Sequence, residues 1–359
     1  MNELYSNSSS SSNHHQHKET HTQIFLENLA VMVLPIVVLF IVLLSMSFQI
    51  LEAQAQLQVG FYRDKCIAAE LIVKEEVEKA FARDKGIAPG LIRMHFHDCF
   101  VRGCDCSIGI DSTPNNLAEK DGPPNGITLR GFEVIENAKT RLEAQCKGVV
   151  SCADIHAFAA RDSAHITGGL SWDVPAGRPD GRISHAAETI DIPAPFDNLD
   201  QATQAFPKKG LTQEEMVALA GAHTIGRSHC SSFSNRLYNF SSTRSQDPSL
   251  VPSYAVQLKQ QCPRGPGGNI DPNIVVQMNF SPALLDRSYY SDILMRRGLF
   301  TSDQALTTDP TTTDQTKMYA SNGLAWQEDF VDAMIKMSQI EVLTGTEGEI
   351  RSNCRMINP

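Results

Sequence analysis

The stretch RMHFHDCFVRGCDCSI, residues 93–108, begins inside a segment that predicts a helix over residues 89–99. On such a helix, Arg93 and His97 lie one turn apart and share a face. A neutral imidazole is a general base near neutral pH, and a guanidinium keeps its charge and stabilises developing negative charge. The pair alone is equally typical of a surface arginine beside a buried histidine, and we expect His95, on another face, to be structural.

A general base beside a fixed positive charge suits the cleavage of a peroxide O–O bond. That reaction needs a proton moved from the near oxygen to the far one, and it needs stabilisation of the charge that separates. Arg93 and His97 are therefore the candidate catalytic pair.

The loop after this helix is rich in metal-ligand residue types. Asp98, Asp105 and Ser107 offer carboxylate and hydroxyl oxygens, which are the ligands that Ca²⁺ prefers. A zinc cluster of histidine and cysteine side chains is the alternative, formed by His95, His97, Cys99, Cys104 and Cys106. Their spacing matches no common zinc pattern, so the sequence favours calcium.

A second candidate centre is His223 in the segment AGAHTIG, residues 220–226. Small neighbours leave room for a flat cofactor against the backbone, although a buried core histidine is the simpler interpretation of this segment alone. Asp303, in GLFTSD (298–303), offers a carboxylate that could accept the other ring N–H of a metal-bound histidine.

The sequence as a whole predicts an all-α fold with at most a few short strands. Thr212 and Glu215 form a capping box, and apolar residues recur at helical spacing, as with Ile67, Leu71, Val77 and Phe81. The predicted helices span residues 67–83, 89–99, 212–223, 288–297 and 325–338. We expect the chain after the leader to divide near residue 200 into two helical lobes, residues 56–200 and 201–359.

The first 55 residues are predicted to be a leader. Residues 29–48 form an uncharged apolar run, and Ala53-Gln54-Ala55 is a pattern that signal peptidase cuts. A retained signal-anchor is the alternative to a cleaved signal, and only then would the chain meet a membrane. The net charge of −10 argues against nucleic acid as a partner.

Nine cysteines follow the leader, and in an exported chain they predict a disulfide framework with one thiol left over. Eight cysteines admit about 105 pairings, so arithmetic alone does not choose among them.

Taken together, these segments resemble the class III plant secretory haem peroxidases, the horseradish-peroxidase-like family. The resemblance covers residues 56–358 in collinear order. Its most specific carriers are RMHFHDCFVRGCDCSI (93–108), EKDGPPN (119–125), RGFEVI (130–135), VSCADI (150–155), GRPDG (177–181), IPAPF (192–196), ALAGAHTIGRSHC (218–230), RGLFTSDQAL (297–306) and LTGTEGEIRSNC (343–354).

The resemblance implies a haem b held between a distal lobe (56–200) and a proximal lobe (201–359). Arg93 and His97 would form the distal pair, with Asn125 hydrogen-bonded to His97. The other implied site residues are His223 as the axial iron ligand, Asp303 as its support, Phe96 as a screen of the haem edge, and Pro193 near the donor site.

The resemblance also implies two calcium sites and four disulfides. The distal calcium would be held by Asp98, Val101, Gly103, Asp105, Ser107 and, through water, Glu119. The proximal calcium would be held by Thr224, Asn279, Ser281, Leu284 and Asp286. The disulfides would be Cys66–Cys146, Cys99–Cys104, Cys152–Cys354 and Cys230–Cys262.

The chain departs from the family pattern at three places. Cys106 replaces a small apolar residue and is the unpaired ninth cysteine. Asn279 is the nearest candidate for an aspartate that usually leads the proximal calcium motif, so that site should bind calcium more weakly. An aromatic that often follows the proximal cysteine is Ser232 here, with Phe233 beside it.

The predicted protein is a secreted, monomeric enzyme of the cell wall or apoplast, with the vacuole as an alternative. It would reduce hydrogen peroxide and oxidise phenolic donors in one-electron steps, and Asn239 would be a glycosylation site. Two rivals remain: a calcium-stabilised binding protein of the same fold without catalysis, and an intracellular ascorbate-using peroxidase. Intact catalytic residues argue against the first, and the leader and cysteines argue against the second.

Overall fold

The computed structural model describes residues 39–41 and 57–359. Residues 57–359 belong to one compact unit. The predicted leader and its cleavage pattern therefore lie outside the described residues, apart from a short helical piece at residues 39–41. None of the helices described is both long and apolar enough to span a bilayer.

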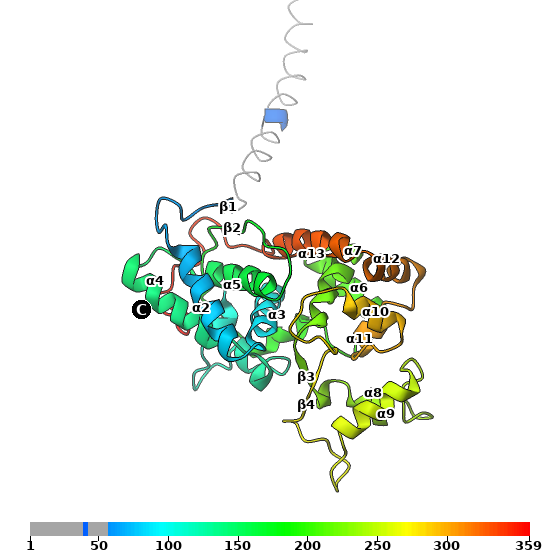
Figure 1. Ribbon diagram of the computed structural model, residues 1–359. Helices are drawn as coiled ribbons and strands as arrows, with labels where there is room; N and C mark the ends of the chain where they lie inside the picture. Colours follow the sequence, from blue (N-terminus) through cyan, green and yellow to red (C-terminus); the bar gives the residue numbers. More distant parts are fainter. Residues whose placement is uncertain (1–38, 42–56) are drawn as a thin grey trace, which may run out of the picture. The chain divides into compact units, whose positions relative to one another are not determined.

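The compact unit is built mainly from α-helices, as predicted (Figure 1). The helices are α2 (Ala69–Arg83), α3 (Ile87–Phe100), α4 (Phe132–Gln145), α5 (Cys152–Ile166), α6 (Leu199–Lys208), α7 (Gln213–Ala220), α8 (Ser234–Tyr238), α9 (Pro252–Gln261), α10 (Ser288–Leu294), α11 (Thr301–Ala305), α12 (Pro310–Ser321) and α13 (Gly323–Met337). Shorter 3₁₀ turns cover Ser107–Gly109, Glu119–Asp121, Gly126–Thr128, Ala186–Asp191, Gly221–Thr224 and Cys230–Ser232.

The described strands form two short antiparallel pairs. Strand β1 (Gln58–Val59) pairs with β2 (Pro175–Ala176), with Gln58 opposite Ala176. Strand β3 (Arg227–His229) pairs with β4 (Val275–Gln277), with Ser228 opposite Val276. Both pairs are too short to organise the core, which the helices provide.

Two groups of helices build the main core. Helix α5 packs against α2, α3 and α4, and α7 packs against α6, α12 and α13, as Figure 1 shows for both groups. A smaller apolar cluster lies around α8 and α9 and includes Leu299 and Phe300. The chain between Gly298 and Asp303 is thus anchored in this smaller core on one side.

Helix α2 corrects one sequence prediction. Of the apolar residues noted at helical spacing, Val77 is buried, whereas Ile67 and Leu71 are 86% and 57% exposed. The helix begins only at Ala69, so Ile67 lies before it, and the helix also buries Ile72 and Val73. The helix packs on α4 and α5, so tertiary packing decides which of its apolar residues are buried.

A fully buried ion pair joins distant segments. Arg178 Nη1 donates to Asp154 Oδ1 at 2.7 Å, and neither side chain is exposed to solvent. The second carboxylate oxygen of Asp154 accepts bonds from the Tyr62 hydroxyl at 2.6 Å and from the Gly177 amide at 2.7 Å. Arg178 Nε also donates to the Ser338 carbonyl at the end of α13, at 2.8 Å.

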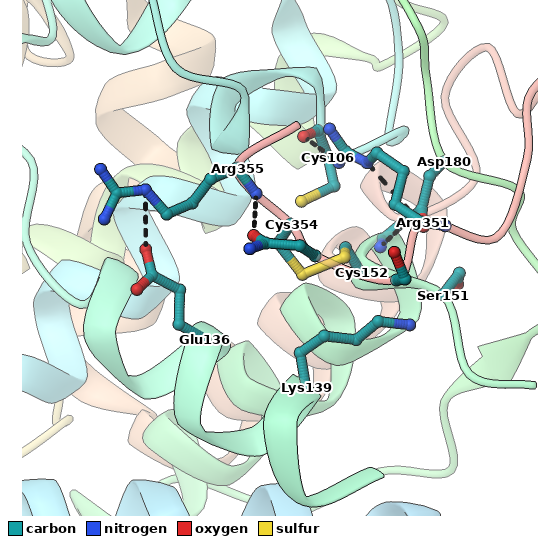
Figure 2. Close-up of a disulfide and its surroundings, with 12 residues drawn as sticks. Cys106, Glu136, Lys139, Ser151, Cys152, Asp180, Arg351, Cys354 and Arg355 are labelled. Atoms are coloured by element: carbon teal, nitrogen blue, oxygen red, sulfur yellow. Dashed lines mark hydrogen bonds and ion pairs between the residues drawn. A yellow bond between two sulfur atoms is a disulfide. The ribbon is translucent and has the colours of Figure 1, made fainter. Parts of the chain in front are cut away.

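The four disulfides in the described chain are those that the family resemblance implies. They join Cys66 to Cys146, Cys99 to Cys104, Cys152 to Cys354, and Cys230 to Cys262. Cys106 is free and buried. Figure 2 shows it beside the Cys152–Cys354 disulfide and Arg351, whose guanidinium donates to the Cys106 carbonyl at 2.6 Å. Burial raises the pKa of the Cys106 thiol well above its ordinary value, so the thiol stays protonated and unreactive.

Replacing Arg178 with methionine is expected to lower the free energy of unfolding by about 3–5 kcal/mol, because it leaves the Asp154 charge buried without a cation. Chemical denaturation would measure the loss. Arg182→Met is the matched control, since this neighbouring arginine is half exposed in its ion pair with Glu349, and it should cost about 1 kcal/mol or less. Equal losses in the two variants would contradict the role given to the buried pair.

Candidate active site

Helix α3 carries both members of the candidate catalytic pair, and it positions His97 through a chain of hydrogen bonds. His97 Nδ1 lies 2.5 Å from Asn125 Oδ1, the bond that the resemblance implies. Asn125 Nδ2 in turn donates to the Glu119 carbonyl at 2.6 Å. Because the amide nitrogen faces a carbonyl, the amide oxygen faces the ring, and His97 Nδ1 must carry the proton. The lone pair of His97 is therefore on Nε2.

The surroundings of His97 keep its ring uncharged. Burial lowers the pKa of His97 well below its ordinary value, the positive charge of Arg93 lowers it further, and the bond to Asn125 raises it in part. A neutral imidazole with a free Nε2 can accept a proton, which is the requirement for a general base.

Arg93 is held by the loop that follows rather than by His97. Its guanidinium donates to the Pro124 carbonyl at 2.9 Å and to the carbonyl and hydroxyl of Thr128, each at 3.0 Å. Burial lowers the pKa of Arg93 to about 10, so it remains charged at neutral pH. The sequence predicted the shared helix face but not Thr128, which has no recognisable signal in its motif.

His223 lies on the 3₁₀ turn Gly221–Thr224, which continues α7. The predicted α-helix was to run through His223, but α7 ends at Ala220 and the chain tightens there. A Cβ atom on Gly221 would approach Trp326 Nε1 to 2.4 Å, so only glycine permits this close packing.

His223 Nδ1 lies 2.7 Å from Asp303 Oδ1, and Asp303 is buried. Among residues 57–359, His223 Nε2 has no hydrogen-bonding partner, and the side chain is 42% exposed. A histidine with one nitrogen fixed by a buried carboxylate and the other free is arranged as a metal ligand.

Two further residues position Asp303, and sequence reasoning missed both. The Tyr289 hydroxyl donates to Asp303 Oδ1 at 3.0 Å. Arg236, fully buried, donates to the carbonyls of Leu299 and Phe300 at 3.0 and 2.8 Å and so fixes the turn before α11. A single sequence offers no signal for either role, because both depend on segments that meet only after folding.

Four residues of the predicted distal calcium site come from the last turn of α3 and the segment that follows it. We call Asp98, Asp105, Ser107 and Glu119 the distal cluster; all four are buried. The Ser107 hydroxyl donates to Glu119 at 3.2 Å, and the Ser107 amide donates to Asp105 at 2.8 Å. Between them the loop turns through Gly103, at φ +87°, against the Glu341 backbone. Within residues 57–359, the Val101 carbonyl oxygen accepts no hydrogen bond.

The distal cluster brings together three buried carboxyl groups, those of Asp98, Asp105 and Glu119. Within residues 57–359, none of its carboxylates forms an ion pair with a cationic side chain, and Glu119 Oε1 has no hydrogen-bond partner. Burial, reinforced by neighbouring carboxylates, raises the pKa of Asp98 well above its ordinary range, that of Asp105 to about 6 and that of Glu119 to about 9. Such a set fits a hard divalent cation.

A second group of oxygens lies next to His223. We call Thr224, Asn279, Ser281, Asp286 and Ser288 the proximal cluster. Its side chains are joined by hydrogen bonds: the Thr224 hydroxyl donates to Asp286 Oδ1 at 3.0 Å and lies 3.1 Å from Ser288 Oγ. Leu284, predicted to offer its carbonyl here, has a side chain that is 49% exposed. Ser288 was not among the residues expected from the sequence.

The remaining predicted site residues take varied positions. The Phe96 ring packs 4.4 Å from that of Phe100 and 5.5 Å from the His97 ring, centroid to centroid. Pro193 is half-buried in a segment joined to α11 by a bond from the Ser302 amide to the Pro195 carbonyl, at 3.1 Å. Phe233 is fully buried, so it does not meet a donor at the surface.

The disulfide between Cys99 and Cys104 rules out the predicted alternative of a zinc cluster. Cys99 and Cys104 are joined in a disulfide, which leaves neither sulfur as a thiolate ligand. His95 is buried beside this disulfide, with its ring 3.8 Å from Cys99 Sγ, as expected for a structural histidine.

Comparison with known proteins agrees with this arrangement of side chains. Residues 73–322 match the family model for peroxidases. The chain is 64% identical over 309 residues to Peroxidase 5 of Vitis vinifera, covering 86% of this chain and 93% of that protein. It is 48% identical over 311 residues to Peroxidase 1 of Zea mays (86% and 84%) and 45% identical over 325 residues to Peroxidase N1 of Nicotiana tabacum (89% and 96%). The chain therefore belongs to the peroxidase family, as a plant class III haem peroxidase, an oxidoreductase that acts on hydrogen peroxide.

Proposed function

We propose that this chain reduces hydrogen peroxide to water and oxidises phenolic donors, one electron at a time, at a haem b ligated by His223. One observation carries the proposal: His97 and His223 each have one ring nitrogen bonded to a buried acceptor, and within residues 57–359 the other nitrogen has no partner. One histidine is thereby prepared to move a proton, and the other to bind a metal.

The proton transfer is assigned to His97. Its free Nε2 accepts a proton from one oxygen of hydrogen peroxide and delivers it to the other oxygen, which leaves as water. The charge of Arg93 stabilises the negative charge that develops on the departing oxygen. Asn125 keeps the proton on Nδ1, and hence keeps Nε2 available, throughout.

On the other side, His223 would hold the iron through Nε2. Haem bound there supplies the redox chemistry, giving electrons to peroxide and recovering them from donors. Asp303, fixed by Tyr289 and the Phe300 amide, increases electron donation from the His223 ring. Phe96 would screen the haem edge, and the Pro193 carbonyl would help to orient a phenolic donor.

We assign one calcium ion to the distal cluster. The ion would bind Asp98, Asp105 and Ser107, with the Val101 and Gly103 carbonyls, and Glu119 through water. Support comes from the unpartnered Glu119 oxygen and the raised carboxylate pKa values. Because Asp98 follows His97 directly, this ion would also fix the end of helix α3.

The proposal includes export and a monomeric state. Residues 1–55 would act as an export signal, and the four disulfides suit an oxidising compartment such as the cell wall, apoplast or vacuole. Residues 56–200 and 201–359 would form the distal and proximal lobes around the haem. Asn239, whose side chain is exposed in an Asn-Phe-Ser sequon, would carry a glycan.

Replacing His97 with alanine is expected to slow the reaction with peroxide by about 10²–10⁴-fold, the usual loss for an acid–base catalyst. Stopped-flow measurement of the Soret band after mixing with peroxide would give the rate. His185→Ala is the control, because His185 is exposed and should leave the rate unchanged. A His97→Ala variant that binds haem and reacts at the parent rate would refute the assignment.

Removing calcium is expected to lower the melting temperature, and to do so more strongly at higher pH. Without the ion, Glu119 keeps a proton in the folded chain that it would lose on unfolding, between its ordinary pKa of 4.5 and its raised value of about 9. The folded state then binds more protons than the unfolded state, so its stability falls as pH rises through this window. Bound calcium takes the place of these protons.

Thermal unfolding of the holoenzyme with calcium or with chelator, at about pH 5 and about pH 8, would measure this effect. The difference in melting temperature between the calcium-loaded and chelator-treated samples should be larger at the higher pH. A difference that is absent, or that narrows as pH rises, would count against calcium at the distal cluster.

A further inference from the structure

The proximal cluster contains an amide where its oxygens converge. Asn279 Nδ2 donates to Thr224 Oγ1 at 3.0 Å and to Ser288 Oγ at 2.7 Å. Asn279 and Thr224 are both buried. An N–H donor therefore points at Thr224, one of the residues that a proximal calcium ion would need as a ligand.

The orientation of this amide is fixed by the backbone. The Ser281 amide donates to Asn279 Oδ1 at 2.8 Å. A backbone N–H requires an acceptor, so the oxygen of Asn279 must face Ser281 and its nitrogen must face the two hydroxyls. Rotating the amide to offer its oxygen to a cation would place two donors opposite each other at Ser281, which is costly for a buried group.

The charge of the proximal cluster is also too small for a divalent cation. Asp286 is its one carboxylate, and the Ser288 amide and the Thr224 hydroxyl already donate to it, at 2.8 and 3.0 Å. Met278, directly before Asn279, is apolar and buried. Calcium affinity falls with the number of anionic ligands. The distal cluster, by contrast, has three buried carboxylates and an unpartnered oxygen.

From this geometry we infer that the Asn279 amide closes the proximal cluster in place of a calcium ion. The chain takes up a single calcium, at the distal cluster. The segment that carries His223 is then held by the Thr224 hydroxyl, which accepts from the Asn279 amide, donates to Asp286 and bonds to the Ser288 hydroxyl, and chelators do not loosen it. The predicted second calcium site does not fit the residues that are present.

The first test is the calcium content of purified holoenzyme after dialysis against metal-free buffer. Elemental analysis should give about one calcium per chain, and Asp98→Asn should remove it. About two ions per chain, or one ion that persists in Asp98→Asn, would overturn the inference. A content near zero would refute the distal calcium proposed above while supporting a proximal cluster closed without metal.

The second test restores the missing charge. Asn279→Asp removes the N–H donor and places a second carboxylate beside Asp286, so calcium content should rise to about two ions per chain. The melting temperature of this variant should also become more sensitive to chelator than that of the parent. Asn273→Asp is the matched control, because Asn273 is exposed on the same connecting segment and should leave the content unchanged. An Asn279→Asp content equal to that of the parent would show that the amide is not what excludes the ion.

Discussion

The Asp154 carboxylate lies at the start of α5, out of reach of water, and its charge has to be neutralised by the protein itself. Arg178 provides the cation, and Tyr62 and Gly177 provide further donors. Since Arg178 also bonds to Ser338, one buried charge joins the first residues of the compact unit, the loop before residue 181 and the end of α13. Leaving Arg178 out would leave the Asp154 charge in the interior without a cation.

The same loop extends this network to the candidate active site. Asp180, two residues on, accepts bonds from the Ala153 and Arg351 amides, both at 2.8 Å. Gly181 donates to the Asp105 carbonyl at 2.7 Å, and a Cβ on Gly181 would approach the Asp105 carboxylate to 2.1 Å. The loop that carries Arg178 therefore also contacts the distal cluster. In the buried ion pair, a protein cation balances the charge; in the distal cluster, no cationic side chain of residues 57–359 forms an ion pair with the carboxyl groups.

Much of this arrangement could be predicted from the sequence, but with clear limits. The predicted helices at residues 89–99 and 325–338 are present within about two residues, because helix start signals and apolar spacing are local properties of the chain. Most of the candidate site residues were predicted from the ordered family motifs rather than from periodicity. The contact between the His97 ring and Asn125, although 28 positions separate them, matches what the family pattern implied.

The sequence did not predict which way individual side chains turn or which partners they meet. No sequence motif indicates that Arg93 donates to Thr128, or that Arg236 donates to the Phe300 carbonyl, shortly before Asp303. The side chain of Asn279 was expected to offer oxygen to a cation, yet the backbone amide of Ser281 turns its nitrogen inward. These outcomes depend on which donor meets which acceptor after distant segments pack together, and no local propensity encodes that.

The last residues of the chain return to its first half. Arg351 meets Asp180 and the Cys106 carbonyl, Cys354 is bonded to Cys152, and Figure 2 shows these contacts together. Asp180, Cys106 and Cys152 lie far earlier in the chain, so their surroundings stay incomplete until residues 351–354 have been synthesised. A chain that stopped before Arg351 would leave Asp180 without the Arg351 amide and guanidinium, and Cys152 without its disulfide partner.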